Sequence, residues 1–127
     1  MTPEVPVVLS EMAKLLIRNA APGTPDGERA NALTLSSMLI ALAAEVWDGA
    51  ADRLVQENRA LARLLSVPAV ETDLHLSVLQ AQNDRLRDLL IIAHVAAEDA
   101  GDTVRQEAIW AELRTSTERR ALSISLV

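Results

Sequence analysis

The sequence predicts an all-α protein: a four-helix bundle built on a long antiparallel helical hairpin, with short extended termini. Its 127 residues include no Phe, Tyr or Cys, and the apolar half is mostly Ala, Leu, Val and Ile. Leucines recur at steps of three and four over two long stretches, which is the spacing of helices packed on helices. A chain of this length forms one domain, so we expect residues 1–127 to be a single helical bundle.

The N-terminal region is predicted to begin extended, because Pro3 and Pro6 lie among apolar residues in segment 1–9. Ser10 is a suitable N-cap for a short helix ending near Asn19. Proline and glycine then crowd residues 20–27, which predicts a loop.

A long helix is predicted over residues 25–66, with Thr24 as its N-cap. Gly49 is the one residue that interrupts the pattern, and a lone glycine costs only about 1 kcal/mol relative to alanine. We therefore expect one helix that bends near Gly49, with a break there as the alternative. Pro68 then predicts a turn.

A third helix is expected over residues 72–100, stopped by Gly101, and a fourth from the cap Asp102 to about Arg120. The last residues alternate apolar and polar side chains, as strands do. This tail is expected to be disordered, to pack in a groove, or to pair with the apolar segment 5–9.

The two long helices carry similar seams, since Asn58-x-x-Leu61 is echoed by Asn83-x-x-Leu86. We interpret them as the two arms of the antiparallel hairpin. An asparagine in a seam can set the register, because its amide must meet a polar partner. The alternatives for Asn58 and Asn83 are edge positions bonded to water, or a polar ligand pocket that includes His94.

The first half of the long helix is apolar on nearly every side, and the third helix is too short to cover it if the hairpin pairs from the Pro68 end. The mean hydropathy of the chain is also slightly positive. These observations predict a homodimer. The interface candidates are Leu35, Met38, Leu39, Leu42, Val46 and Trp47.

The formal net charge is −6, which argues against nucleic acid as a partner. Residues 68–100 hold six acids against two bases, so most of the excess lies there. Asp84 and Asp88 are candidates for an acidic docking face that takes a basic protein partner. The alternative is ordinary solvated charge on a helix surface.

No catalytic constellation is visible, and we expect no enzyme, no metal site and no cofactor. Without cysteine the chain has no thiolate ligands. His75 and His94 lie on different sides of one predicted helix and cannot share a metal. The longest uncharged stretch, residues 30–44, has 15 residues, fewer than the roughly 20 that span a bilayer. No basic region precedes an apolar run at the start, so we expect a cytoplasmic protein that does not enter membranes.

Two functional hypotheses follow. The first is a non-enzymatic, dimeric protein-interaction module of coiled-coil character. The alternative is a regulatory helical bundle that binds a small molecule in an apolar pocket between its helices.

Overall fold

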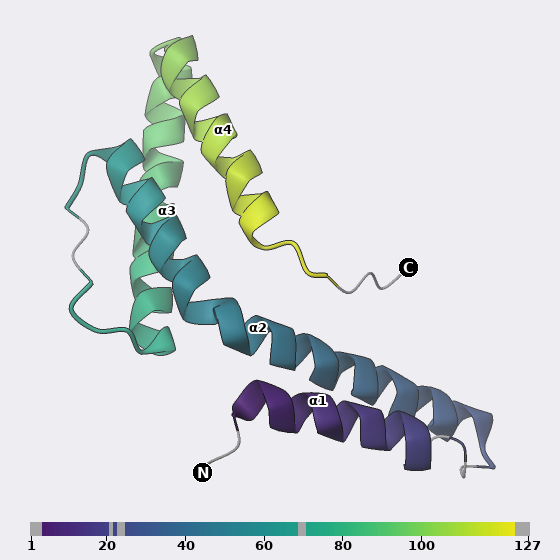
Figure 1. The fold of residues 1–127 in the computed structure, drawn as a ribbon. Helices are drawn as coiled ribbons and strands as arrows, with labels where there is room; N and C mark the ends of the chain where they lie inside the picture. The colour runs from purple at the N-terminus through teal and green to yellow at the C-terminus, as the bar shows by residue number, and fades with distance from the viewer. Residues whose placement is uncertain (1–3, 21, 23–24, 69–70, 124–127) are drawn as a thin grey trace. The chain divides into compact units, whose positions relative to one another are not determined.

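The computed structural model describes residues 4–20, 22, 25–68 and 71–123. This part of the chain is helical and contains no strand, which confirms the all-α prediction. The elements are α1 (Val5–Leu15), a π-helical turn η1 (Leu16–Ala20), α2 (Gly27–Leu65), α3 (Leu76–Asp99) and α4 (Thr103–Arg119) (Figure 1). The chain divides into two compact units, an N-terminal unit (residues 1–49 with 122–127) and a C-terminal unit (residues 50–121). That the whole chain is one domain stays a prediction.

The first helix begins earlier than predicted. Its N-cap is Glu4 and Pro6 lies in its first turn, so the expectation of an extended chain is wrong for residues 5–9, as is that of Ser10 as the cap. Residues 1–3 lie outside the described part of the chain. The first backbone N–H groups of a helix have no partner inside the helix, so a proline costs nothing there. The chain continues from α1 into η1 without a break.

Helix α2 runs through Gly49 without interruption, so the alternative of a break at this position is wrong. Asp26 stands before its first residue, and its carboxylate accepts a hydrogen bond from the Glu28 backbone N–H (2.9 Å). The predicted cap Thr24 lies outside the described residues.

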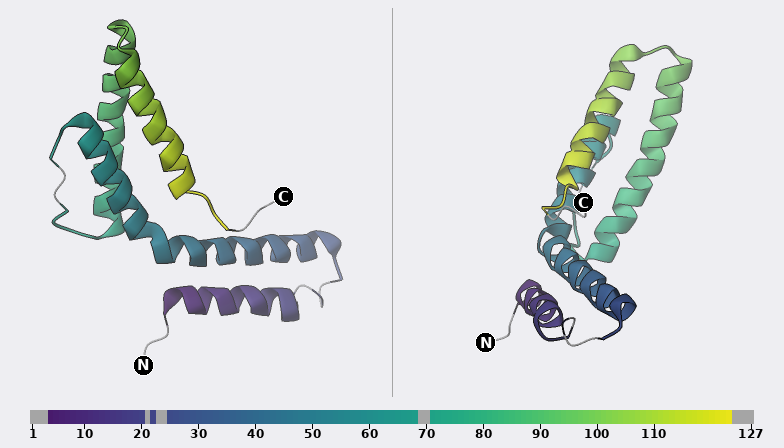
Figure 2. Two further views of the ribbon diagram at one scale, coloured as in Figure 1. Left: turned by 45° about the horizontal axis from the view of Figure 1, so that its top comes forward. Right: turned by 90° about the vertical axis from the view of Figure 1, so that its right-hand side faces the viewer.

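In the N-terminal unit, α1 lies beside the first half of α2 in every view (Figures 1 and 2). The contact is made by small residues: Ala13, Ser37 and Ala44 are each buried. The Ser37 hydroxyl donates to the Ala13 carbonyl oxygen (2.8 Å), which satisfies a polar group that is otherwise costly to bury. The small-residue face of α2 is thus covered by α1.

In the C-terminal unit, the last part of α2 and the following α3 run in the same direction, and α4 runs back along α3 (Figures 1 and 2). The predicted antiparallel hairpin is therefore wrong. The segment between Leu65 and Leu76 is longer than the two to five residues that usually join antiparallel helices, and ten extended residues reach about 30 Å. That reach lets the chain run back along the last part of α2, so that α3 begins close to the level of Asn58.

The apolar core of this unit lies where three helices meet. Leu61 of α2, Leu90 of α3 and Ile109 of α4 are almost fully buried and form one cluster. Half-buried leucines surround it: Leu64, Leu65, Leu86 and Leu113. The seam residues Leu61 and Leu90 thus bury as the heptad pattern predicted.

Two helices of the C-terminal unit end in the same motif. After α3, Gly101 has a φ of +64°, and the Asp102 N–H donates to the Ala97 carbonyl oxygen (2.9 Å). After α2, Ser66 has a φ of +56°, and the Val67 N–H donates to the Ala62 carbonyl oxygen (3.0 Å). Both are left-handed C-terminal caps, where glycine is the favoured residue. Gly101 as a helix stop is therefore confirmed, as is Asp102 as a cap, since its carboxylate accepts from the Arg105 N–H.

The start of the C-terminal tail is held by α2 within the N-terminal unit. The backbone N–H and the hydroxyl of Ser123 both donate to the Glu45 carboxylate, at 2.7 and 2.8 Å. Pairing of the tail with segment 5–9 as two strands is wrong, because that segment is helical. Ile124 and Leu126, which carry the rest of the alternating pattern, lie outside the described residues.

The two caps predict opposite effects of exchanging their residues. Gly101→Ala should lower the free energy of unfolding by about 1 kcal/mol, because a Cβ is strained at this φ although no neighbour would meet it. Ser66→Gly should raise the free energy of unfolding by about 0.5 kcal/mol, because it relieves the same strain. Urea unfolding followed by circular dichroism measures both changes. If the free energy of unfolding moved in the same direction in both variants, this account would be contradicted.

Candidate functional site

The two seam asparagines meet in the interior of the C-terminal unit. Asn58 of α2 is 2% exposed and Asn83 of α3 is fully buried. The Asn83 amide donates to the Asn58 side-chain oxygen (2.9 Å), and the Asn58 amide donates to the Leu79 carbonyl oxygen (3.0 Å). The interpretation of both as edge residues bonded to water is wrong. Their pairing holds α2 and α3 in one register, since a shift along either helix would leave both amides unsatisfied.

Beside this pair lies an ionic cluster around a buried carboxylate. The Glu57 carboxylate, whose side chain is 3% exposed, accepts from Arg87 of α3 (2.5 Å) and from Arg120 at the end of α4 (2.9 Å). Arg87 also donates to the Asn83 oxygen (3.0 Å) and to the Ser116 hydroxyl (3.3 Å). We call this set the Glu57 network; its members are Glu57, Asn58, Asn83, Arg87, Ser116 and Arg120. It joins the three helices of the unit.

The network keeps Glu57 ionised. Burial alone would raise the pKa of this carboxyl group, but the hydrogen bonds from Arg87, Arg120 and Asn83 outweigh burial and lower the pKa to about 2. A carboxylate with so low a pKa and with its oxygens already occupied is a poor general base at neutral pH. The arrangement is therefore suited to holding helices in place rather than to moving protons.

Sequence reasoning missed Glu57 and Arg87, although a signal was present. Glu57 lies three residues after Leu54 and four before Leu61, and Arg87 lies four after Asn83 and three before Leu90. Both positions thus fit the seam spacing as well as the predicted seam residues do. A charged residue at a seam position of one helix indicates a buried ion pair when the facing seam position of the neighbouring helix holds the opposite charge.

His94 lies apart from the asparagines, so the proposed pocket that joined all three is wrong. Its ring meets Trp110 of α4 edge to face, with centroids 5.5 Å apart. Nε2 is buried and makes no hydrogen bond within the described chain, while Glu98 Oε1 lies 3.7 Å away. The Trp110 side chain is half exposed and caps the histidine from outside.

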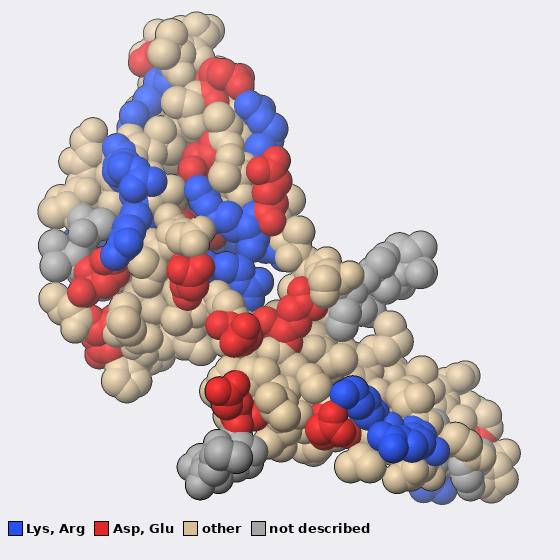
Figure 3. Space-filling view, in the orientation of Figure 1, with Lys and Arg blue, Asp and Glu red and all other residues tan. Residues whose placement is uncertain are grey.

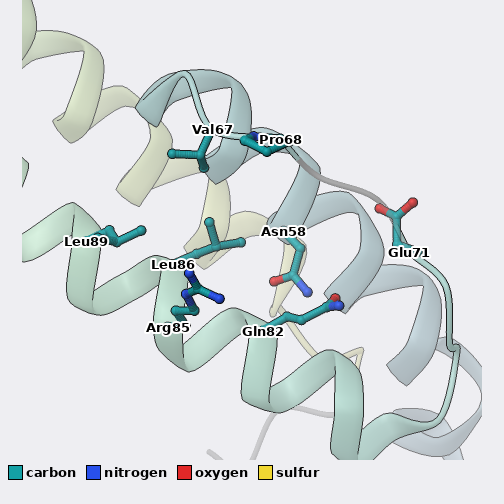
Figure 4. Close-up of a pocket in the computed structure, with 8 residues that line it drawn as sticks. All are labelled: Asn58, Val67, Pro68, Glu71, Gln82, Arg85, Leu86 and Leu89. Carbon is teal, nitrogen blue, oxygen red and sulfur yellow. The ribbon is translucent and has the colours of Figure 1, made fainter.

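A cavity of about 330 Å³ opens between α2, α3 and the segment that connects them (Figure 4). Asn58 lines it from α2, Leu86 and Arg85 from α3, and Val67 and Pro68 from the connecting segment. Its volume lies at the lower end of the range for small-molecule sites, and its lining mixes apolar and polar groups. The Glu71 carboxylate at its edge pairs with Arg59 (2.9 Å).

The predicted dimer-interface residues are largely uncovered. Leu35, Leu39 and Trp47 are more than half exposed, at 55%, 54% and 55%. Met38 and Leu42 are half-buried, and Val46 is 38% exposed. This half of the helix is therefore not buried on all sides within the described chain, and its burial in a homodimer stays a prediction. The exposure of Trp47 identifies it as a surface residue rather than a core residue.

Helix α2 is also the one helix of the described chain that is long and apolar enough to cross a membrane. Length and composition alone are weak evidence for a membrane span, because a mostly buried core helix of a soluble protein and a signal sequence near the N-terminus share both features. Only 11% of the most apolar window is buried within the chain.

The acidic candidates Asp84 and Asp88 lie on the exposed side of α3. Asp84 accepts a hydrogen bond from the Gln80 side chain (2.8 Å), one turn earlier on the same helix. Over the face of the molecule drawn in Figure 3, acidic and basic side chains lie next to one another.

Within residues 4–20, 22, 25–68 and 71–123, no three His, Asp or Glu side chains come together in a group that could hold a metal ion. The chain matches no known protein-family model, no curated protein and no solved structure. Its function must therefore be argued from its own surfaces and buried groups.

The Glu57 network predicts an acid-sensitive contribution to stability. The folded-state pKa of about 2 lies below the ordinary value of 4.5, so the ionised group stabilises the fold above about pH 4.5. That contribution, about 3 kcal/mol, should be lost as the pH falls towards 2. We expect Glu57→Gln to lower the free energy of unfolding strongly at pH 7, because it leaves two arginines without their buried counter-charge.

Urea unfolding of wild type and Glu57→Gln at several pH values between 7 and 3 measures this effect. The difference between the two proteins should shrink as the pH falls. The exposed Glu118→Gln is the matched control and should behave as wild type. An unchanging difference between wild type and Glu57→Gln would show that the carboxylate is not held by its charge.

Proposed function

We propose that the protein is a non-enzymatic, dimeric protein-interaction module of the cytoplasm. The observation that carries this proposal is an apolar stripe of α2, in which Leu35, Leu39 and Val46 are exposed and Leu42 is half-buried. Successive members are four, three and four residues apart, so they share one side of the helix. We call these four residues the α2 stripe.

Among the described residues of the N-terminal unit, no helix covers the α2 stripe. Ser37 and Ala44 form the side of α2 that meets α1. At about 100° of rotation per residue, that side lies roughly half a turn around the helix from Leu35 and Leu39. Among the described residues the stripe therefore points away from α1, and a partner that covered it would bury these apolar side chains.

A second copy of the chain is the partner that suits the α2 stripe. An apolar stripe with steps of three and four can pack against its own symmetry mate as in a coiled coil. Two α2 helices in contact, each with its own α1, would make a four-helix bundle from two copies. The predicted four-helix bundle would then be intermolecular. Each leucine buried in this way adds about 2 kcal/mol to the association.

Alternative occupants of the stripe fit less well. A membrane would have to accept the charged Glu45 and Asp48 within or beside the apolar segment, which costs free energy. Nucleic acid is disfavoured by the net charge of −6. The proposal needs no cofactor and no metal.

The dimer is tested by the double variant Leu35→Glu, Leu39→Glu. Native mass spectrometry over a concentration series should give a dimer for wild type and a monomer for the variant. The dimer of the variant should dissociate at a concentration at least about 100-fold higher, because two leucines in each of the two copies are replaced by like charges. Ser36→Glu places one charge beside the stripe and should remain dimeric. A monomeric wild type, or recovery of wild type in the membrane fraction, would refute the proposal.

A second candidate function, binding of a small molecule, is favoured by the 330 Å³ cavity beside Asn58. Freshly purified protein should then carry an additional mass that survives native mass spectrometry. Gln82→Trp places a large ring at the wall of the cavity and should remove that mass while the helical circular dichroism stays unchanged. Absence of any additional mass from wild type would count against this candidate.

A further inference from the structure

We propose that the outward side of α3 is a docking face for an amphipathic helix of a different protein, whose apolar centre is flanked at both ends by Lys or Arg. This inference rests on the proposed role as an interaction module but does not depend on the dimer. The chemistry of one surface indicates the kind of partner. We call that surface the α3 face; it consists of Asp84, Asp88, Ile91, Ile92, Val95, Glu98 and Asp99.

All seven residues of the α3 face are exposed. Ile91 is 63%, Ile92 66% and Val95 51% exposed, which is unusual for large aliphatic side chains so close together. They lie opposite the buried residues of α3: Leu79, Asn83, Leu90 and Ala97. At about 100° per residue the seven positions fall within roughly one third of the circumference, so they form one continuous surface.

The arrangement along the helix is acidic, then apolar, then acidic. Asp84 and Asp88 precede the aliphatic group, and Glu98 and Asp99 follow it. From Asp84 to Asp99 the face is about 22 Å long, close to four helical turns. The surface itself contains no basic residue, but the exposed Arg85 borders it on the side of Ile92. A partner that matches it carries its apolar residues in the middle and its positive charges at the two ends.

The carboxylates of the α3 face are not neutralised by lysine or arginine elsewhere in the described chain. The ion pairs of those side chains involve other acids, such as Glu57, Glu71 and Glu112. Glu98 lies near His94 alone, and Asp84 is bonded to the neutral Gln80. Four uncompensated acids around an apolar centre repel one another and are relieved by a basic partner.

Charge also argues against a second copy of the same face as the occupant. In an antiparallel pair, Asp84 and Asp88 of one copy would oppose Glu98 and Asp99 of the other, and in a parallel pair each acid would oppose its own counterpart. Both arrangements place like charges together, which disfavours association. The face therefore selects a heterologous helix.

The test uses two synthetic helices of 18 residues with the same leucine stripe. One has lysines in its first and last turns and the other has glutamates at the same positions. Titration of ¹⁵N-labelled protein by NMR should show binding of the lysine peptide, with shifts confined to the α3 face, and no binding of the glutamate peptide. Because a single-helix contact is small, we expect moderate affinity that weakens at high salt.

Variants of the α3 face separate docking from general attraction between charges. Asp84→Lys with Asp88→Lys should weaken the lysine peptide at least tenfold and strengthen the glutamate peptide. Ile91→Ala with Ile92→Ala leaves the charges unchanged and should also weaken the lysine peptide. Asp52→Lys with Glu118→Lys makes the same change of net charge outside the face and should leave binding within twofold of wild type.

Binding that ignores the isoleucines, or shifts that lie outside α3, would overturn the inference. A change in the oligomeric state of the peptide-free protein on altering Asp84 and Asp88 would instead identify the face as a contact between copies. That result would also overturn the inference. A monomeric wild type that still binds the lysine peptide at this face refutes the dimer alone. A dimer that binds neither peptide refutes the docking face alone.

Discussion

The C-terminal unit depends on one buried carboxylate. Glu57 can lie in the interior only because Arg87 and Arg120 bring donors to it from two other helices. An ion of this kind without partners would cost several kcal/mol, so the three helices must hold the positions that supply those donors. The apolar cluster around Leu61 and Leu90 would tolerate many small displacements of one helix along another. The carboxylate, together with the Asn58–Asn83 pair, does not tolerate them.

This requirement also accounts for the direction of α3, which the sequence pattern could not provide. Heptad spacing identifies the side of a helix that is buried, but the same spacing suits parallel and antiparallel neighbours. The echo between Asn58-x-x-Leu61 and Asn83-x-x-Leu86 was the informative signal, because matching motifs meet in register only when the helices run the same way. Pro68 follows soon after the end of α2, but a proline does not tell how far the chain travels before the next helix begins.

Local signals predicted helix ends where the end is set by one residue. Gly101 and Asp102 mark the junction of α3 and α4 through a left-handed backbone and a capping carboxylate. The prediction failed at Pro6, because a proline is compatible both with an extended segment and with a first helical turn. Of the candidate site, the meeting of Asn58 with Asn83 followed from their seam positions. Glu57 was missed because a charged side chain normally indicates solvent.

The distribution of basic residues connects the interior to the surface. Arg87 and Arg120 are used on Glu57, Arg119 on Glu112 and Arg59 on Glu71. The chain has 18 acids and only 12 lysines and arginines. Because several of these cations are held in such pairs, some acids elsewhere have no basic partner. On α3 they remain at the two ends of an exposed aliphatic group, where an incoming cation meets an adjacent apolar contact. The ionic pairing that orders the interior thus leaves an outer surface whose charge can select a partner and whose apolar centre can hold it.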